Sequence, residues 1–319
     1  MVTPATTVYV HVGYPKTATT TFQKHLFPGH PEIDYLGKFI PGFGFRTESL
    51  ENELNALISR DDTRYEGTQK LAELIRQYRG GSHRPALLIS TESIVHPWAT
   101  DRGLVARRLH EALSPCRIIV TIREQLDSIK SYYGRHGRFG QYLFLTKETG
   151  EQLSLPMTLP EWLTYSLRTS DKNYIGTLRY YETISYYAKL FGRDNVGVFL
   201  YEEFVRDQEA YVRRLCRFLG VHDVEKAVEL VRGRHELPSL TRGELFFLRI
   251  ESRLPAALRM DGLHRLGRKL SALVPRASSA GAISIDPPWL EQLAALYRES
   301  NRKLQQTFDL PLERYGYLL

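Results

Sequence analysis

Residues 8–21 read VYVHVGYPKTATTT, and this stretch decides the fold class. Residues 8–12 form a β-branched and aromatic run that predicts a strand, which stops at Gly13-Tyr14-Pro15. A helix-compatible stretch follows at residues 19–26. Where a strand passes through such a loop into a helix, backbone N–H groups and hydroxyls can surround an anion at the helix N-terminus.

Three later apolar runs, at residues 86–90, 117–122 and 196–201, predict further strands. Short, continuous apolar runs suit strands of a parallel sheet that are buried on both faces. Helix-compatible segments alternate with them, and Gly220 is well placed to end the last one. These segments are residues 48–58, 69–78, 104–113, 177–190 and 204–219. The alternation predicts an α/β fold of three layers, with a central parallel sheet flanked by helices.

Polar residues follow the first three predicted strands directly, namely Lys16, Glu92 and Arg123. In open parallel sheets, ligands bind at the carboxyl ends of the strands. We therefore expect these three side chains to converge on one crevice.

The chain is predicted to be a single domain over residues 1–319. Residues 134–173 interrupt the strand and helix rhythm with scattered Gly, Thr and Pro, so we expect an inserted region on the acceptor side. Residues 222–319 are predicted to be a mainly helical C-terminal part, whose last helix begins near Trp289 after a flexible link.

Composition is that of a globular protein, with 319 residues, 42% hydrophobic and 25% charged. The two cysteines, Cys116 and Cys216, stand in hydrophobic stretches. This excludes a disulfide framework and argues against a thiolate metal site, so no metal is predicted. The net charge of +7 suits an anionic ligand. No nucleic-acid-binding motif accompanies it, so a nucleic-acid partner is not expected.

The beginning of the chain has no basic segment and no small-residue cleavage site, so no signal peptide is expected. No window holds about 18 uninterrupted apolar residues, so no membrane-spanning helix is predicted. We expect a cytoplasmic location.

The lysine of the loop precedes the threonines. The Walker order GxxxxGK[ST] places lysine after a second glycine, whereas here Pro15-Lys16 is followed by Thr17-Ala18-Thr19-Thr20. This order resembles the 5′-phosphosulfate-binding loop of sulfotransferases that use 3′-phosphoadenosine 5′-phosphosulfate (PAPS), commonly written P-K-[ST]-G-T-T. The family's glycine is Ala18 here, which predicts a backbone torsion φ that is not positive, since alanine disfavours that region. A capped helix start with a surface lysine is the alternative reading of the loop.

A second pair resembles the family's 3′-phosphate site, which is an arginine at a strand end and a serine eight residues later. Here these are Arg123 and Ser131. Arginine grips phosphate oxygens with a planar fork, and a helix hydroxyl can donate from the side. A third match, from Val198 to Val221, is similar to the family's late strand and helix block. The resemblance implies a P-loop-like fold and PAPS as donor, with adenosine 3′,5′-bisphosphate (PAP) as product.

The resemblance also implies roles for these residues. Lys16 would neutralise charge on the bridging oxygen of the leaving phosphate. Residues of the loop would hold the 5′-phosphate and sulfonate, and Arg123 with Ser131 would distinguish PAPS from ATP. The loop residues are Pro15, Lys16, Thr17, Ala18, Thr19, Thr20 and Thr21.

The general base is predicted to be Glu92, since members of the family often use a carboxylate or histidine near this place. A helix-capping or lysine-pairing carboxylate is its structural alternative. His96 and His136 are the next candidates, whereas His11 alternates within the first strand and is predicted to be a core residue. A loose basic stretch at residues 232–242 is read as a solvated face rather than a loop that closes on the donor.

The sequence thus predicts an enzyme that transfers a sulfuryl group to a hydroxyl or amine. The resemblance and the basic charge suggest a carbohydrate or lipid-linked sugar as acceptor, with small phenols or alcohols close behind. Two alternatives remain: a P-loop-type kinase, which would require the Walker order, and a nucleotide- or polyanion-binding module without catalysis, which would not need Glu92.

Overall fold

The computed structural model describes residues 6–38, 44–95, 101–134, 157–168, 173–234 and 283–319. The chain divides into two compact units. Unit 1 comprises Met1–Glu124, Thr177–Glu236 and Tyr297–Leu319, and unit 2 comprises Gln125–Gly176 and Leu237–Leu296. Each unit is described by itself. The expectation of one functional domain over the whole chain stays a prediction.

Unit 1 is built on a five-stranded sheet whose strand order is β2-β3-β1-β4-β5. All four neighbouring pairs are parallel, and Val10 of the central strand pairs with Ile89 on one side and Ile118 on the other. The strands are β1 (Thr7–His11), β2 (Ile33–Tyr35), β3 (Ala86–Ser90), β4 (Cys116–Ile122) and β5 (Val196–Leu200). Parallel strands require crossover connections, and helices supply them here.

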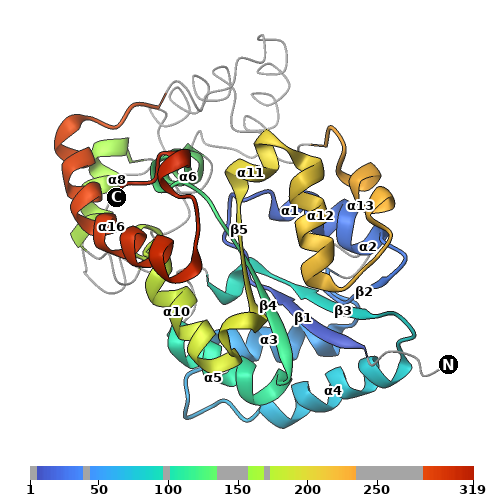
Figure 1. Cartoon of the computed structure of the whole chain (residues 1–319). Coiled ribbons are helices and arrows are strands. Elements are labelled where there is room, and N and C mark those ends of the chain that lie inside the picture. Colours follow the sequence, from blue (N-terminus) through green and yellow to red (C-terminus); the bar gives the residue numbers. More distant parts are fainter. Residues whose placement is uncertain (1–5, 39–43, 96–100, 135–156, 169–172, 235–282) are drawn as a thin grey trace, which may run out of the picture. The chain divides into compact units, whose positions relative to one another are not determined.

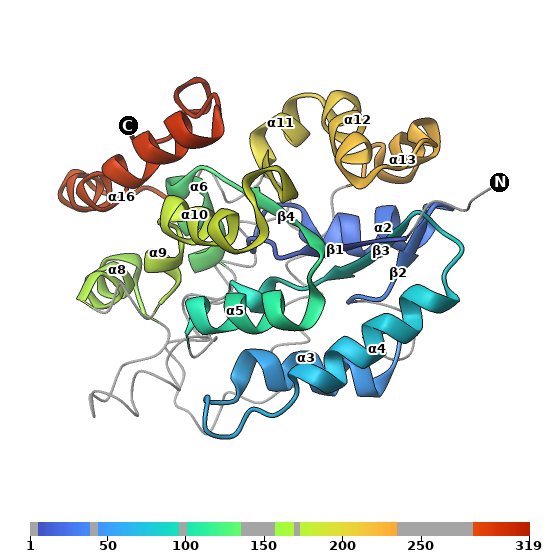
Figure 2. The same ribbon diagram turned by 60° about the horizontal axis from the view of Figure 1, so that its bottom comes forward.

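Helices cover both faces of this sheet, which confirms the predicted three-layer α/β class (Figures 1 and 2). Figure 2 shows one face covered by three helices, α3 (Glu48–Ser59), α4 (Thr68–Gly81) and α5 (Arg102–Leu113). The other face is covered by α11 (Tyr201–Arg206), α12 (Gln208–Leu219) and α13 (Val224–Val231). A further helix, α10 (Tyr180–Phe191), packs against β4 and α5.

The core on the α12 face is aromatic. Phe22 stacks on Tyr211 with ring centroids 5.8 Å apart, and Phe204 meets both rings edge-on. Each such side chain contributes about 1.5–3 kcal/mol on burial, and paired rings add about 1 kcal/mol. This cluster fixes the helix that follows the residue 13–21 loop against the sheet.

Several helices begin at the side-chain caps that their sequences provide. The capping side chains accept hydrogen bonds from backbone amides three residues on, and they are Thr47, Asp101, Asp207 and Asp223. Gly220 ends α12 in the left-handed region at φ 64°, as its position predicts. Both cysteines are buried, and neither forms a disulfide in the structure.

Two features of unit 1 differ from the sequence reading. Strand β2 was not predicted, because three residues are too few to show a period. The helix predicted at residues 19–26 is divided into α1 (Thr19–Thr21), a π-helical turn η1 (Phe22–Leu26) and α2 (Phe27–Gly29). Single π-helical turns of this kind are frequent at functional sites.

The described part of unit 2 is helical. Tyr132 of α6 (Gln125–Tyr132) stacks on Tyr174 of α9 (Tyr174–Thr177) with centroids 3.7 Å apart, and Trp162 of α8 (Leu159–Arg168) packs beside Tyr132. Helix α8 lies within the predicted insertion of residues 134–173. Helix α16 (Pro287–Phe308) begins two residues before Trp289, close to the predicted start.

Candidate functional site at the strand ends

The loop after β1 has an unusual backbone. Gly13, Lys16 and Ala18 all have positive φ, at 94°, 70° and 62°. The sequence reading that Ala18 would not have a positive φ is therefore wrong. Alternating left-handed residues turn successive backbone N–H groups to one side, and such a concave arrangement binds anions. The left-handed conformation costs a non-glycine residue on the order of 1 kcal/mol.

Two threonine hydroxyls of the loop donate within the protein. Thr17 is buried, and its Oγ1 donates to the carbonyl of Tyr14 at 2.5 Å. Oγ1 of Thr19 donates to Oε1 of Glu92 at 2.5 Å. Thr20 is half-buried and Thr21 is buried. The loop therefore keeps its shape through its own hydroxyls and is tied to the end of β3.

Glu92 begins a short 3₁₀ turn, η2 (Glu92–Ile94), directly after β3. Its Oε2 is 3.2 Å from Nζ of Lys38, and its side chain is 14% exposed. Burial raises the pKa of this carboxyl, but the charge of Lys38 and the hydrogen bonds from Thr19 and Gln23 outweigh burial and hold the pKa at about 2. Glu92 is therefore a carboxylate at neutral pH.

A buried polar chain lies next to this carboxylate. Nε2 of Gln23 donates to Oγ of Ser90 at 2.9 Å, and Nδ1 of His11 is 2.8 Å from the same oxygen. Burial lowers the pKa of His11 to about 4, although the negative charge of Glu92 acts against this shift. His11 is therefore a neutral, hydrogen-bonded core residue, which confirms its sequence reading.

Arg123 lies just beyond the end of β4, next to the loop. Its Nη1 donates to the carbonyl of Lys16 at 3.3 Å, and its guanidinium lies over the ring of Tyr201, 4.7 Å from the centroid. The hydroxyl of Tyr180 donates to the carbonyl of Arg123 at 2.7 Å. The fold thus brings Lys16, Glu92 and Arg123 to the same edge of the sheet, as expected for parallel strands.

A half-buried carboxylate, Glu202, holds the turn that follows Arg123. Oε1 of Glu202 accepts from the backbone N–H of Glu124 at 2.8 Å, and Oε2 accepts from the hydroxyl of Tyr317 at 3.2 Å. Burial raises the pKa of Glu202, and these hydrogen bonds and the charge of Arg123 act in the opposite direction. The backbone at residues 123–124 is consequently held directly by Tyr180 and Glu202, and Tyr317 in turn holds Glu202.

Residues 104–234, which include β4, Arg123, β5 and α12, match a family model described as the sulfotransferase domain. The chain carries a sulfotransferase domain. This match supports sulfuryl transfer as the class of reaction. The loop of residues 13–21 and Glu92 lie outside the matched residues.

Solved structures include sulfotransferases with the same fold. One from Alicyclobacillus acidocaldarius has a TM-score of 0.51 at 16% identity, covering 99% of each chain. The mouse sulfotransferase SULT7A1, solved in complex with PAP, has a TM-score of 0.49 at 13% identity, covering 95% of this chain and 88% of that chain. Among curated proteins, none matches the sequence. The likeness to the first of these structures is one of fold, and it covers 99% of this chain.

For several predicted site residues, the structure gives no contact with the loop or with the strand ends. Ser131 lies on α6 in unit 2, so its pairing with Arg123 stays a prediction. His96 and His136 lie outside the described residues, as do His235, Ser239 and Arg242 of the basic stretch. Arg234 is described, and its Nη1 is 2.6 Å from Nδ1 of His25.

Three residues of this site were not predicted from the sequence. They are Lys38, Tyr180 and Tyr201. Lys38 was not predicted because β2 was not predicted, and the rule that ligand-binding residues follow strands can be applied only to strands that have been recognised. Tyr201 stands at a strand end like Arg123 and could have been found by that rule. Nothing local distinguishes Tyr180 from the other tyrosines of α10.

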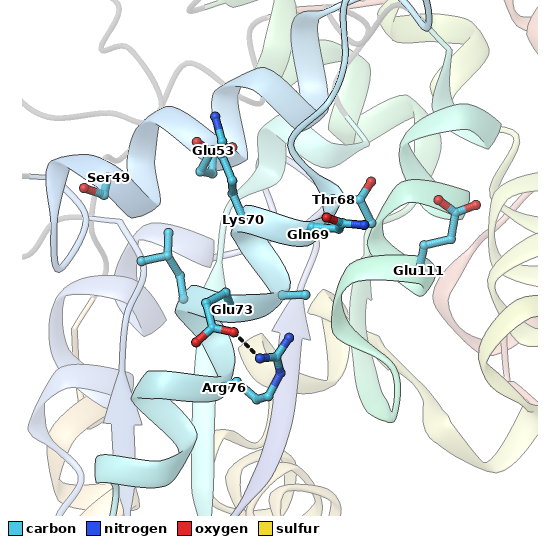
Figure 3. Close-up of a pocket in the computed structure, with 10 residues that line it drawn as sticks. Ser49, Glu53, Thr68, Gln69, Lys70, Glu73, Arg76 and Glu111 are labelled. Carbon is cyan, nitrogen blue, oxygen red and sulfur yellow. Dashed lines mark hydrogen bonds and ion pairs between the residues drawn. The ribbon is translucent and has the colours of Figure 1, made fainter.

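A separate depression of about 810 Å³ lies on the helical layer (Figure 3). Ten residues line it, among them Glu53 of α3, Lys70 and Glu73 of α4, and Glu111 of α5, and Figure 3 shows Glu73 paired with Arg76. None of the lining residues belongs to the loop or to a strand end. Ligands of parallel sheets bind at the strand ends, so we do not place the chemistry in this depression.

The described residues were also searched for metal ligands and for membrane-spanning helices. Among the described residues, no group of three His, Cys, Asp or Glu side chains is arranged to hold a metal ion. No described helix is both long and apolar enough to cross a bilayer.

Proposed function

We propose that the chain transfers a sulfuryl group from PAPS to a hydroxyl, or an amine, of an acceptor and releases PAP. The observation that carries this proposal is the 2.5 Å hydrogen bond from Thr19 to Glu92. It joins an ionised carboxylate to a loop whose backbone suits an anion. A base and an anion cradle in contact are the two parts that transfer of a charged group to a hydroxyl requires.

The residues of the loop suit an anionic donor. The positive φ angles of Lys16 and Ala18 support a backbone cradle for the 5′-phosphate and sulfonate. Lys16 would neutralise charge on the leaving phosphate oxygen, and Pro15, Thr17, Thr20 and Thr21 would complete the loop around it. Arg123 and Ser131 would hold the 3′-phosphate, which ATP lacks.

The proposed reaction is a single displacement at sulfur. A bond forms between the acceptor oxygen and sulfur, and the bond between sulfur and the bridging phosphate oxygen breaks. The electron pair of the broken bond stays on the 5′-phosphate oxygen, and the acceptor proton passes to Glu92. A carboxylate with a low pKa accepts this proton late, because the hydroxyl becomes acidic only as its bond to sulfur forms.

Donor binding is the first test. Calorimetry should give micromolar binding of PAP and none of ATP or ADP with Mg²⁺, and Arg123→Ala should abolish the preference. Arg107→Ala is the matched control, because Arg107 is an arginine of α5 that bonds to Tyr186 and its loss changes the net charge equally. Preferential binding of ATP would favour a kinase, and binding of neither ligand would refute the proposal.

Catalysis needs its own variant. Glu92→Gln keeps the shape of the side chain and should leave PAP affinity within about 3-fold while lowering sulfuryl transfer about 100-fold or more. Unchanged transfer would remove Glu92 from the mechanism and leave His96 and His136 as candidate bases. Binding of PAP without transfer to any acceptor would favour the non-catalytic module.

The acceptor class is the finer part of the proposal. A carbohydrate or lipid-linked sugar suits the positive net charge of +7 if the acceptor is itself anionic. The test is transfer of radiolabelled sulfate from PAPS to a panel of oligosaccharides, glycolipids, phenols and simple alcohols. Transfer to phenols or alcohols alone would contradict the carbohydrate assignment and leave the donor chemistry intact.

A further inference from the structure

Lys38 follows strand β2 and reaches the candidate base from the edge of the sheet. Its Nζ is 3.2 Å from Oε2 of Glu92, while Oε1 of the same carboxylate accepts from Thr19 at 2.5 Å. The two carboxylate oxygens are therefore engaged by groups from different segments. One oxygen contacts a cation and the other a neutral hydroxyl.

The backbone at Lys38 is fixed by two hydrogen bonds and by the close approach of the neighbouring Gly37 to Ser90. The hydroxyl of Tyr35 donates to the carbonyl of Lys38 at 2.9 Å, and the N–H of Lys38 donates to the carbonyl of Ser90 at 3.4 Å. At Gly37, an added Cβ would stand 2.6 Å from the backbone nitrogen of Ser90. Only glycine allows this close approach, which brings the end of β2 against the end of β3.

These contacts distinguish the pair from an ordinary surface ion pair. A pair between two exposed, mobile side chains contributes about 0–1 kcal/mol. Here the side chain of Glu92 is 14% exposed and that of Lys38 is 37% exposed. A largely buried carboxylate needs a counter-charge to remain ionised, so the cation beside it has a specific task.

Within the part of the chain that the structure describes, the other groups recorded as interacting with Glu92 are neutral. His11 on β1 is neutral, because burial lowers its pKa to about 4. Tyr35 on β2 is a neutral phenol whose pKa is raised by burial. Thr19 on α1 and Gln23 on η1 are neutral donors.

We propose that Lys38 is a positioning residue that orients the Glu92 carboxylate and supplies its counter-charge. The inference rests on the proposed role of Glu92 as the base. It predicts that Lys38 decides the pH range over which the enzyme works, although it need not touch the donor.

The direct test is a titration of the Glu92 carboxyl by carbon NMR in the donor-free protein, assigned with Glu92→Gln. The carboxyl should titrate well below the ordinary value of 4.5 in the native protein. Lys38→Met, which keeps an unbranched side chain without the charge, should raise that pKa by about one unit or more. Lys38→Arg should restore the low value. Lys226→Met is the control, because Lys226 pairs with Glu229 on the surface of α13.

The functional readout is the pH dependence of sulfuryl transfer. The acidic limb of the kcat/KM profile should move to higher pH in Lys38→Met by the same shift as the NMR titration, and Lys38→Arg should bring it back. A carboxyl pKa that is unchanged in Lys38→Met would overturn the inference, whatever the activity. A shifted pKa in a protein that transfers no sulfuryl group would support the counter-charge role and refute the proposed function.

Discussion

The hydroxyl of Tyr180, at the start of α10, donates a 2.7 Å hydrogen bond to the main-chain carbonyl of Arg123. Tyr180 is fully buried, so the bond is made away from competing water. On the other side of the same turn, Glu202 accepts from the N–H of Glu124. The arginine proposed to hold the 3′-phosphate thus projects from a backbone that is fixed by a buried side chain, Tyr180, and a half-buried one, Glu202.

Removing that bond should weaken donor binding without touching the donor. Tyr180→Phe deletes one hydroxyl and should raise the dissociation constant of PAP about 3- to 10-fold, the effect of one neutral hydrogen bond. Calorimetry measures it, with the neighbouring Tyr181→Phe as control. Equal PAP affinity in the native protein and in Tyr180→Phe would show that Arg123 is positioned without this contact.

The strained loop predicts a stabilising substitution. Ala18→Gly relieves the positive φ of 62° and should raise the free energy of unfolding by up to about 1 kcal/mol. Ala72→Gly, inside α4, should lower it by about 1 kcal/mol, because there the backbone is helical. Urea denaturation of both variants gives the comparison, and a loss of stability in Ala18→Gly would contradict the strain.

Lys16 should matter more for the reaction than for binding. Lys16→Met removes the charge proposed to stabilise the leaving oxygen and should lower kcat about 100- to 1,000-fold. The affinity for PAP should fall about 10-fold or less, since backbone amides and Arg123 remain. Lys24→Met, an exposed lysine of η1, is the control. A loss confined to KM would assign Lys16 to binding alone.

Acid should destabilise unit 1 through His11. The pKa of His11 is 6.5 when unfolded and about 4 when folded, so between these values the unfolded chain binds more protons. Stability therefore falls as the pH drops from 6.5 towards 4, by about 2 kcal/mol between pH 7 and pH 5. Glu92 does not contribute to this change in stability between pH 7 and pH 5. Its lowered pKa affects the free energy of unfolding only below its unfolded pKa of 4.5.

Replacing the histidine should remove that slope. His11→Asn keeps a polar group towards Ser90 but does not titrate, so its unfolding free energy should change little between pH 7 and pH 5, even if the variant is less stable overall. His83→Gln, at an exposed histidine, should keep the native slope. Urea titrations at both pH values measure the difference, and an equal slope in His11→Asn would contradict the assignment.

Most of the fold follows from local patterns. The predicted strand at residues 86–90 coincides with β3, and the other three predicted strands agree with β1, β4 and β5 to within a residue at each end. A buried parallel strand has to be apolar along its length, so it shows in the sequence. Strand β2 is short and lies at the sheet edge, and it shows no such run.

In the candidate site, too, some features could be predicted from the sequence and others could not. Lys16, Glu92 and Arg123 follow strands, so the parallel order alone placed them at one edge. The sign of φ at Ala18 was predicted wrongly, because alanine's intrinsic preference is about 1 kcal/mol and the contacts of the loop exceed it.

The sequence by itself determined the α/β class, the candidate anion-binding loop and the carboxylate at the end of β3, since each depends on residues that are neighbours in the chain. Tertiary structure alone decided that Lys38 pairs with Glu92 and that Tyr180 holds Arg123, across 54 and 57 positions of the chain. Such contacts depend on how sheet and helices pack, and local residue preferences contain no information about that packing.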